Sequence, residues 1–295
     1  MDSRNEKAAE KLAFHRWKPA AWLRVTGEDA FTFLQGQFTN DLRSLRSNEG
    51  VYGLWLNHKG KVVADSFVLS GGAEEFWVGS YFSAAKTIQE RLEAFVIADD
   101  VTIEDQTSSW VGLTVFSEAL VAKPDSTVLV FKGRRALQAH REWIAPVDQA
   151  SDLFANAGVV DERDELEMER LRIESQIPRV PDDIGAGELP NEGGLDEVGI
   201  SYTKGCYLGQ EVMARLKNLG QVRRRLLRVR GSGPLPPTPA AIFAGDKRIG
   251  ELRTAVATTD GFVGLALLSL LNLTSQTPLR FSPELSTTVL LDSAL

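Results

Sequence analysis

The sequence predicts an α+β fold, and three observations support this prediction. Apolar patterns of period two and of period 3.6 alternate through the first half of the chain, which favours a mixed architecture over an all-α or all-β one. The order of the predicted elements resembles split β-α-β modules more than a doubly wound parallel sheet. Short strands separated by turns follow residue 239, and they predict a small β-barrel at the C-terminal end.

The composition is that of an ordinary globular chain. The 295 residues are 43% hydrophobic and carry a net charge of −7, which argues against disorder. At roughly 150 residues per domain, the length suggests two domains or three small ones. The single cysteine excludes an intrachain disulfide, and it excludes a Cys-rich zinc or iron–sulfur site built from this chain alone.

Two observations argue against export and membrane insertion. Residues 1–10 carry several charged side chains and no apolar stretch, so they predict neither a secretory signal nor an acidic-poor transit peptide. The longest apolar run, 261–273, is shorter than the roughly 20 residues that span a bilayer. We therefore expect a cytoplasmic protein without a membrane partner, and we assign no metal site.

Periodicity and capping residues define the first predicted elements. Residues 6–14 have a helical pattern, and 22–25 have the pattern of a strand. Thr26 is the predicted N-cap of the next helix, because an acidic residue follows three positions later. Two strand-like runs, 52–56 and 62–69, are joined by a polar turn and predict a β-hairpin.

A second helix is predicted over 83–95, with Ser83 as its cap and Ile88 and Leu92 on its apolar face. A loop rich in Pro and Gly at 231–239 cannot be regular structure. Further strands are predicted at 76–78, 101–104, 110–116 and 127–131, and barrel strands at 240–243, 250–255, 262–268 and 288–291.

Charge is segregated along the second half of the chain. Residues 161–197 contain thirteen acidic residues against four arginines, whereas 204–230 contains eight basic residues against Glu211. The acidic segment begins as a predicted helix, and Pro and Gly make the rest irregular. The arginines of 223–230 could bind nucleic acid, but no RNA-binding motif accompanies them. We expect them to pair with the acidic segment, and a role in guiding polyglutamylated folate or RNA stays open.

Cys206 lies in the sharpest local motif, residues 202–212. Glycines on both sides leave the thiol accessible, and a helix predicted at 208–216 places its N-terminal dipole near the sulfur. Together with the cation of Lys204, these features favour a thiolate, the form needed by a nucleophile, a redox sensor or a metal ligand. The alternative is a buried, inert cysteine, because the three histidines are scattered and no Cys-His pair is evident.

Residues 204–211 read K-G-C-Y-L-G-Q-E and resemble the K-G-C-Y-x-G-Q-E signature of the YgfZ family, folate-binding proteins tied to iron–sulfur cluster maintenance. A second stretch, 27–41, resembles the G-x-D-A-x-x-F-L-Q-G-Q-x-T-N-D stretch near the start of that family. Shorter matches follow in the expected order at 60–61, 172–174, 177–178, 189–192, 249–252 and 264–268. The resemblance covers about residues 20–270.

The YgfZ family is similar in fold to the T-protein of the glycine cleavage system, a tetrahydrofolate-dependent aminomethyltransferase. The resemblance implies a T-protein-like folate-binding fold, with ferredoxin-like, split β-α-β modules around a central cavity and a small C-terminal β-barrel. It implies a folate-binding α+β region at 1–220 and a barrel domain at 221–295. The first region would hold two interleaved modules, about 20–105 with 150–220, and 106–150.

Tetrahydrofolate, or a one-carbon derivative of it, is the ligand that the resemblance implies. A pterin edge needs a carboxylate, its ring needs an aromatic or apolar wall, and its anionic glutamate tail needs Arg or Lys. Glu192, Tyr207 and Arg172 are candidates for these three tasks. Asp65 matches the hairpin strand in which T-proteins have an adjacent Asp pair that includes the catalytic residue.

The signature implies a functional centre at Cys206. Its thiolate would handle a transient sulfur, metal or one-carbon species, with Lys204 lowering its pKa. Gly209 would give access to the thiol. Gln210 and Glu211 would orient their neighbours by hydrogen bonding, with an Arg four positions after Glu211 as its ion-pair partner.

The sequence therefore predicts a tetrahydrofolate-binding accessory protein that supports iron–sulfur cluster assembly or repair in client enzymes. A folate-dependent aminomethyltransferase of the glycine cleavage type is the alternative, although the chain lacks the G-Y-T-G-E segment that supplies a pterin-binding Glu in T-proteins. A third possibility is a folate-binding or interaction module with a structural cysteine. Because Cys206 is the only cysteine, a cluster bound there would be shared with a client or a second copy.

Overall fold

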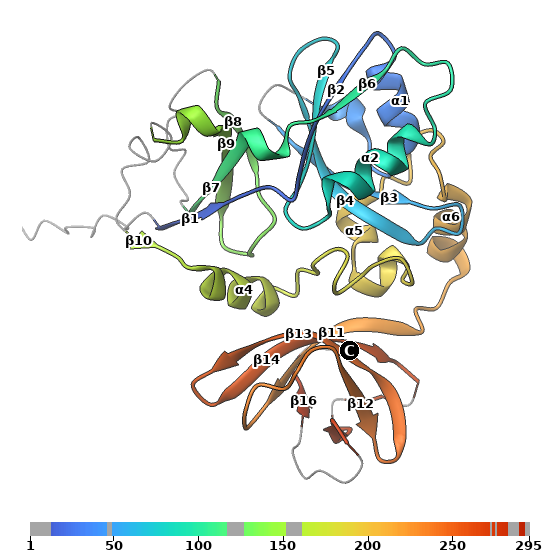
Figure 1. The fold of residues 1–295 in the computed structure, drawn as a ribbon. Coiled ribbons are helices and arrows are strands. Elements are labelled where there is room, and N and C mark those ends of the chain that lie inside the picture. The colour runs from blue at the N-terminus through green and yellow to red at the C-terminus, as the bar shows by residue number, and fades with distance from the viewer. Residues whose placement is uncertain are drawn as a thin grey trace, which may run out of the picture.

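The computed structural model describes residues 13–45, 49–116, 127–151, 161–271, 273–274, 276–282 and 289–292. These residues form two five-stranded sheets and a closed barrel of six strands. In Figure 1 the two sheets lie side by side above the barrel, and helix α4 (Glu165–Glu174) lies between one sheet and the barrel. No helix in the described part of the chain is long and apolar enough to cross a membrane.

The first sheet is antiparallel between all neighbouring strands and has the order β3-β4-β5-β2-β6. Its strands are β2 (Ala21–Thr26), β3 (Val51–Leu56), β4 (Val62–Ser70), β5 (Glu75–Ser80) and β6 (Thr102–Asp105). Helices α1 (Ala30–Gln37) and α2 (Ala85–Glu93) pack on one face of this sheet and share its apolar core. The predicted hairpin and the predicted second helix are therefore confirmed.

The second sheet has the order β10-β1-β7-β9-β8. Its strands are β1 (Ala13–Trp17), β7 (Trp110–Phe116), β8 (Leu129–Lys132), β9 (His140–Pro146) and β10 (Asp161–Glu162). Three residues separate β1 from β2, so the chain passes directly from one sheet to the other. The helix predicted at 6–14 lies mostly outside the described residues, and its last two residues belong to β1 instead.

Two predicted caps are wrong. Helix α1 begins at Ala30, with Asp29 rather than Thr26 at the N-cap position, and Thr26 ends β2. Helix α2 has Ala84 at its N-cap, whereas the Ser83 hydroxyl donates to a buried carboxylate. Local capping rules assigned both residues to helix N-caps. In the structure, Thr26 is instead paired within the sheet, and the Ser83 hydroxyl makes a tertiary hydrogen bond.

Irregular chain and short helices connect the second sheet to the barrel. The proline- and glycine-rich part of the acidic segment is irregular, as predicted. Gly209 caps α6 (Gln210–Leu219) with a left-handed φ of +87°, which favours glycine. The remaining short helices are η1 (Leu42–Ser44), η2 (Thr107–Ser109), η3 (Val147–Gln149), η4 (Pro190–Gly193) and α5 (Asp196–Gly199).

The barrel closes in the order β11-β14-β13-β12-β15-β16, which confirms the predicted C-terminal barrel. Its strands are β11 (Arg224–Gly231), β12 (Ala240–Ala244), β13 (Lys247–Thr258), β14 (Gly261–Ser269), β15 (Leu279–Arg280) and β16 (Val289–Leu291). Strand β14 is buried on both faces, which explains its unbroken apolar sequence.

The two faces of β14 serve two different cores. Phe262, Ala266 and Leu268 fill the barrel interior. Leu265 and its neighbours on the opposite face pack against Ile173 of α4 and against the irregular segment that follows this helix. The second core fixes the barrel beneath the rest of the molecule.

Substituting Leu265 with Ala should lower the free energy of unfolding by about 2–5 kcal/mol, because it removes a fully buried side chain between the barrel and α4. Urea unfolding would measure the change. The matched control is Leu271→Ala, at a leucine that is 67% exposed, which should change the free energy by less than about 0.5 kcal/mol. Equal effects of the two substitutions would contradict the assignment of Leu265 to this core.

Candidate functional site

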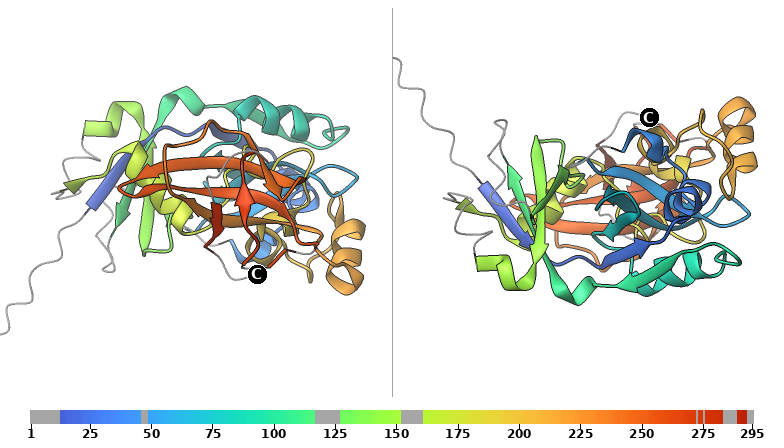
Figure 2. Two further views of the ribbon diagram at one scale, coloured as in Figure 1. Left: turned by 90° about the horizontal axis from the view of Figure 1, so that it is seen from below. Right: turned by 90° about the horizontal axis from the view of Figure 1, so that it is seen from above.

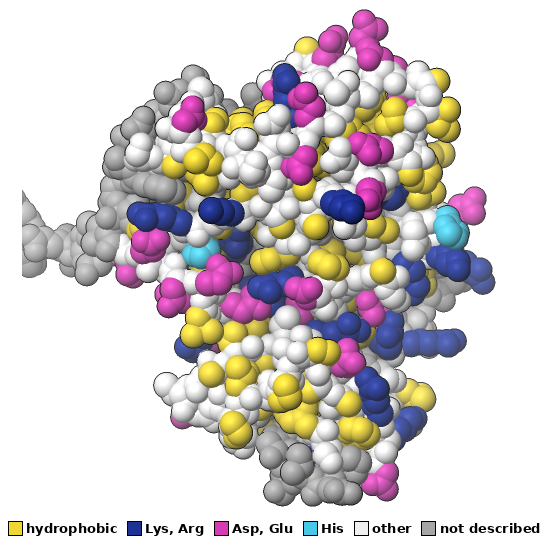
Figure 3. Space-filling view, viewed as in Figure 1, with side chains coloured by type: hydrophobic (Ala, Val, Ile, Leu, Met, Phe, Trp, Pro, Cys, Tyr) yellow, Lys and Arg dark blue, Asp and Glu magenta, His cyan; other side chains and the backbone are white. Residues whose placement is uncertain are grey.

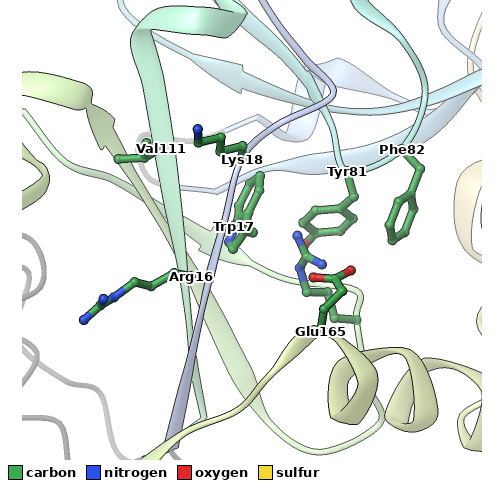
Figure 4. A pocket seen from close by; sticks show the side chains of 8 residues that line it. Arg16, Trp17, Lys18, Tyr81, Phe82, Val111 and Glu165 are labelled. Carbon is green, nitrogen blue, oxygen red and sulfur yellow. The ribbon is translucent and has the colours of Figure 1, made fainter.

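A cavity of about 410 Å³ opens where the two sheets meet α4. Figure 4 shows its wall, to which β1, β7, the loop after β5, the turn between β8 and β9, and the start of α4 contribute. The lining residues are Arg16, Trp17, Lys18, Tyr81, Phe82, Val111, Arg135 and Glu165. The cavity therefore combines three aromatic rings with three cations and one carboxylate.

Arg135 is the centre of this wall. Its guanidinium lies 4.0 Å from the ring centroid of Tyr81 and 4.7 Å from that of Trp17, two rings that contact each other edge-to-face at 5.2 Å, so it makes a cation–π contact with both. Its Nε lies 3.6 Å from Oε1 of Glu142, which is completely buried. Glu142 accepts hydrogen bonds from the hydroxyls of Tyr81, at 2.9 Å, and Thr114, at 2.8 Å. The carboxylate thus anchors the cation from behind.

Two donors of the cavity wall have no hydrogen-bond partner. Trp17 Nε1 and Arg135 Nε are both buried, and the two side chains are more than nine-tenths buried. Arg135 Nε faces the Glu142 carboxylate at 3.6 Å, whereas Trp17 Nε1 has neither a hydrogen bond nor an ion pair among the described residues. Buried donors are normally paired, so the indole N–H is the donor of this wall that a ligand would complete. Ligand cavities with mostly aromatic walls and a few convergent polar groups have volumes of about 300–1,000 Å³, a range that includes this one.

Asp65 lies nearby in a closed network of hydroxyls. Its Oδ1 accepts from Ser83, at 2.7 Å, and from Ser80, at 2.8 Å, and its Oδ2 accepts from Tyr52, at 3.1 Å. Burial raises the pKa of the Asp65 carboxyl, although these three hydrogen bonds and the charge of Arg134 oppose the rise. Asp65 is therefore an acid that the fold holds closer to its neutral form than an exposed aspartate.

The turn between β8 and β9 joins the Asp65 network to the cavity wall. Arg134 stacks on Tyr52 at 4.7 Å from the ring centroid, and its backbone N–H donates to the Tyr81 hydroxyl. Arg134 and Arg135 also line a second, smaller pocket of about 10 Å³, which shares Phe82 and Glu165 with the cavity. One short turn thus positions both networks.

Arg172 and Glu192, predicted to bind folate, are occupied by internal ion pairs. Arg172 is 3% exposed and donates to Asp183, at 2.6 Å, and to Glu169, also at 2.6 Å. Glu192 accepts from Arg224 of the barrel at 2.9 Å. Arg172 reaches the edge of the small pocket, whereas Glu192 joins η4 to β11.

Lys204 is directed away from the solvent. It is 4% exposed, and its Nζ donates to the backbone carbonyls of Gln35, Phe38 and Asn40. Burial lowers the pKa of this amine to about 8. The lysine therefore ties the loop of Cys206 to the end of α1, and its donors are used by carbonyls.

Cys206 is exposed, so the alternative of a buried cysteine is wrong. The next residue, Tyr207, is buried, and its hydroxyl has no hydrogen-bond partner. Gly209 and Gln210 form the start of α6. Glu211 is exposed, and the predicted ion pair between Glu211 and Arg215 is absent from the described structure.

The predicted site residues therefore fall in two separate places. Figures 1 and 2 show α6, which follows Cys206, at one end of the molecule, and β1 and the start of α4, which line the cavity, at the other. Asp65 belongs with the cavity, and residues 204–211 belong with α6. The structure thus separates an open, aromatic cavity from an exposed thiol.

Sequence reasoning missed the cavity wall itself. Trp17, Tyr81, Arg135 and Glu142 come from distant parts of the chain and carry no motif. Glu142 follows His140 and Arg141 in β9, so the sequence did not mark it as buried, although a buried carboxylate needs partners.

Comparisons with known proteins agree with this architecture. A family model described as the GCVT N-terminal domain matches residues 17–119, and the model of the CAF17 C-terminal beta-barrel domain matches 223–290. The mouse mitochondrial iron-sulfur cluster assembly factor IBA57 is 31% identical over 84% of this chain and 75% of its own length. The tRNA-modifying protein YgfZ of Edwardsiella ictaluri is 30% identical over 89% of this chain and 86% of its own.

The chain belongs to the YgfZ and IBA57 family. The resemblance found in the signature residues is thereby confirmed. Its relatives carry names that refer to iron–sulfur cluster assembly and to tRNA modification.

The fold of this YgfZ-like chain also matches a solved enzyme structure. The glycine cleavage system aminomethyltransferase T from Bartonella henselae superposes with a TM-score of 0.80, covering 97% of this chain and 86% of the enzyme, at 15% sequence identity. The predicted T-protein-like α+β fold with a C-terminal barrel is confirmed. At this identity the match establishes the fold and leaves the activity open.

Replacing Asp65 with Asn should make the protein more stable at neutral pH, because a neutral amide avoids the cost of burying a charge. The raised pKa means that the folded wild type holds the proton over a range in which the unfolded chain releases it. The contribution of Asp65 therefore lowers the stability of the wild type as the pH rises above about 4. The Asp65→Asn variant has no carboxyl at this position, so its stability should not decrease in this way.

Urea unfolding at a series of pH values between about 4 and 7 would test this prediction, with the difference between the proteins growing as the pH rises. Asp148→Asn, on an exposed residue, is the matched control. An Asp65→Asn stability that runs parallel to wild type at every pH would contradict the assignment.

Proposed function

We propose that this protein is a tetrahydrofolate-binding accessory factor that supports iron–sulfur cluster assembly or repair in client enzymes. Family membership supports the cluster-related part of this proposal, because several relatives are named as iron–sulfur cluster assembly factors. The cavity supports the folate-binding part. The proposal includes the cytoplasmic location that the sequence predicts.

The observation that carries the folate proposal is the wall of Trp17, Tyr81 and Arg135, in which the guanidinium lies over both rings and Trp17 Nε1 has no hydrogen-bond partner in the described part of the chain. A pterin or aminobenzoyl ring is planar and stacks on aromatic rings and on a guanidinium. The carboxylates of the glutamate tail match Arg16 and Lys18 at the same cavity. Bound tetrahydrofolate would supply the one-carbon chemistry, and these residues would bind and orient it.

Cys206 is the second part of the proposal. Its thiol is exposed on the loop just before α6, and Figure 1 shows α6 at the end of the molecule away from β1, so the thiol is placed to meet a client rather than the folate ring. An exposed thiolate can accept a transient sulfur or ligate a metal that the client also ligates. We therefore assign folate binding and client contact to different surfaces of the chain.

Folate-dependent aminomethyl transfer is the second candidate, favoured by the fold of the aminomethyltransferase neighbour and by the buried Asp65 beside the cavity wall. Release of a one-carbon unit from an aminomethylated carrier protein by the purified chain would establish this candidate. Folate binding without turnover would favour the accessory factor.

Substituting Arg135 with Met should weaken tetrahydrofolate binding by about tenfold or more, because the variant keeps most of the volume and loses a stacked, charge-assisted donor. Isothermal titration calorimetry would measure the dissociation constant. Lys18→Met is a second cavity variant, which keeps Arg135 and therefore does not leave the buried Glu142 without its cation. Arg248→Met on the barrel is the matched control. Unchanged affinity in both cavity variants would rule out this cavity as the folate site.

Substituting Cys206 with Ala should abolish complementation of a null strain, because Cys206 supplies the only thiol in the chain. The activity of the strain's iron–sulfur enzymes would measure complementation. Tetrahydrofolate affinity should stay within about twofold of wild type, since the residue lies away from the cavity.

Thr203→Ala, at an exposed neighbour on the same loop, is the control for Cys206→Ala and should complement fully. Full complementation by Cys206→Ala would assign the cysteine a structural role and favour the folate-binding or interaction module.

A further inference from the structure

Cationic side chains that form no ion pair in the described structure lie on the segments next to the loop of the exposed thiol, namely the tip of the β3–β4 hairpin, α6 and the chain that follows α6. The tip of the β3–β4 hairpin packs on the start of α6, because a Cβ on Gly60 would lie 2.9 Å from Val212, and one on Gly209 would lie 3.0 Å from the carbonyl of Asn57. This contact puts the lysines of the tip beside the outer side of α6. We call the surface the Cys206 face; its charged residues are Lys59, Lys61, Glu197, Glu211, Arg215, Lys217, Arg223 and Arg225.

The cations of the Cys206 face lack carboxylate partners. Among the described residues, Lys59, Lys61, Arg215, Lys217 and Arg223 form no ion pair, and Arg225 reaches Glu197 only at 4.0 Å. Lys217 instead lies over the ring of a neighbouring tyrosine. In Figure 3 Lys and Arg side chains gather along the right-hand edge, at and just below the position of α6 in Figure 1.

The contrast with the adjoining strand is informative. Arg224 pairs with Glu192 of the acidic segment, as predicted, whereas Arg228 and Arg230 pair with Asp292, which lies outside that segment. The segment 161–197 supplies Glu192 and, more distantly, Glu197, and none of its other carboxylates pairs with the Cys206 face in the described structure. Within the described segment 204–230, the exposed cations without a carboxylate partner are therefore Arg215, Lys217 and Arg223, on α6 and just after it.

We propose that the Cys206 face is the docking surface for an acidic patch on a protein partner, and that docking brings this partner to the thiol. The inference rests on the proposed function in one respect, the choice of Cys206 as the functional centre. Complementary charge accelerates encounter and fixes orientation, which an exposed thiol needs in order to select one partner.

A protein fits this face better than a nucleic acid does. The face carries the carboxylates Glu197 and Glu211 among its cations. Asp196 interacts with Arg225, so a phosphate backbone would meet three negative charges there. Tyr207 is buried, and the half-buried Tyr202 ring already lies under Lys217 at 4.0 Å, which opposes stacking on a base. The chain as a whole carries a charge of −7, which repels a long polyanion such as a nucleic acid and weakens its binding. A local acidic patch lies within one Debye length, about 10 Å at 0.1 M salt, and is attracted by the face alone.

The test uses a short fluorescein-labelled poly-L-glutamate peptide as the probe, with binding followed by anisotropy at low ionic strength. The charge-reversal variant is Lys59→Glu, Arg215→Glu and Lys217→Glu, and the matched control is Lys86→Glu, Lys247→Glu and Arg248→Glu on exposed residues of α2 and the barrel. We expect the face variant to bind about tenfold or more weakly than wild type, and the control within about twofold of it. Equal losses in both variants would overturn the proposal.

Access to the thiol gives a second reading. Saturating peptide should slow labelling of Cys206 by the uncharged reagent N-ethylmaleimide several-fold in wild type and should have no effect in the charge-reversal variant. Undiminished labelling under saturation would place the peptide elsewhere and overturn the proposal. If the triple variant does not fold, the single variant Arg215→Glu, at an exposed residue, replaces it in both the binding and the labelling measurement.

A single-stranded RNA oligonucleotide is the competing probe. RNA that binds more tightly than the peptide, through the same three cations, would overturn the proposal in favour of a nucleic-acid surface. Neither assay contains folate or a cluster, so failure here leaves the complementation result standing. If Cys206→Ala still complements, the peptide-binding assay can still be carried out, because it depends on the cations of the face and not on the thiol.

Discussion

The buried guanidinium of Arg172 is the interaction on which both the fold and the cavity depend. It joins α4 to the irregular segment through Asp183, and to the barrel through Thr254. Asp183 is fully buried, and removing one member of such a pair typically costs about 3–5 kcal/mol, because the remaining charge stays buried without its partner. Three parts of the molecule therefore share one ion pair.

The support continues from this ion pair to the cavity. Asp183 also accepts from the backbone N–H of Arg179, whose guanidinium lies 4.4 Å from the ring centroid of Phe82 in the cavity wall. In the same segment, the carbonyl of Val180 accepts from the Ser83 hydroxyl, which also donates to Asp65. Arg172, which the sequence predicted to bind folate, therefore supports the cavity wall from the protein interior.

The β3–β4 hairpin is the physical link between the cavity and the Cys206 face. Asp65 lies on β4 opposite Leu54, and the tip of the same hairpin contacts α6 at Gly60. The five residue steps from Gly60 to Asp65 span roughly 16 Å at the rise of a β-strand. One rigid, antiparallel pair of strands therefore sets the separation between the two functional surfaces.

Local patterns in the sequence predicted much of this fold, and long-range contacts account for what they missed. The hairpin, α2 and the barrel strands follow from period and turn residues within one segment, which is why they were predictable. The caps assigned to Thr26 and Ser83 failed because β2 pairing and Asp65, respectively, use those residues. Lys204 looked like a neighbour for the thiol, but its partners are carbonyls about 165 positions away in sequence.

The exposure of Cys206 constrains what the thiol can do. An iron–sulfur cluster needs about four ligands, and the chain has one cysteine, so a cluster held at this position takes its other ligands from another molecule. Shared ligation requires both molecules to approach within bonding distance, which an exposed thiol permits and a buried one would prevent. An open surface with cations that lack ion pairs near α6, within the described residues, is consistent with this requirement, whereas a small planar ligand needs the concave, aromatic surroundings that the cavity provides.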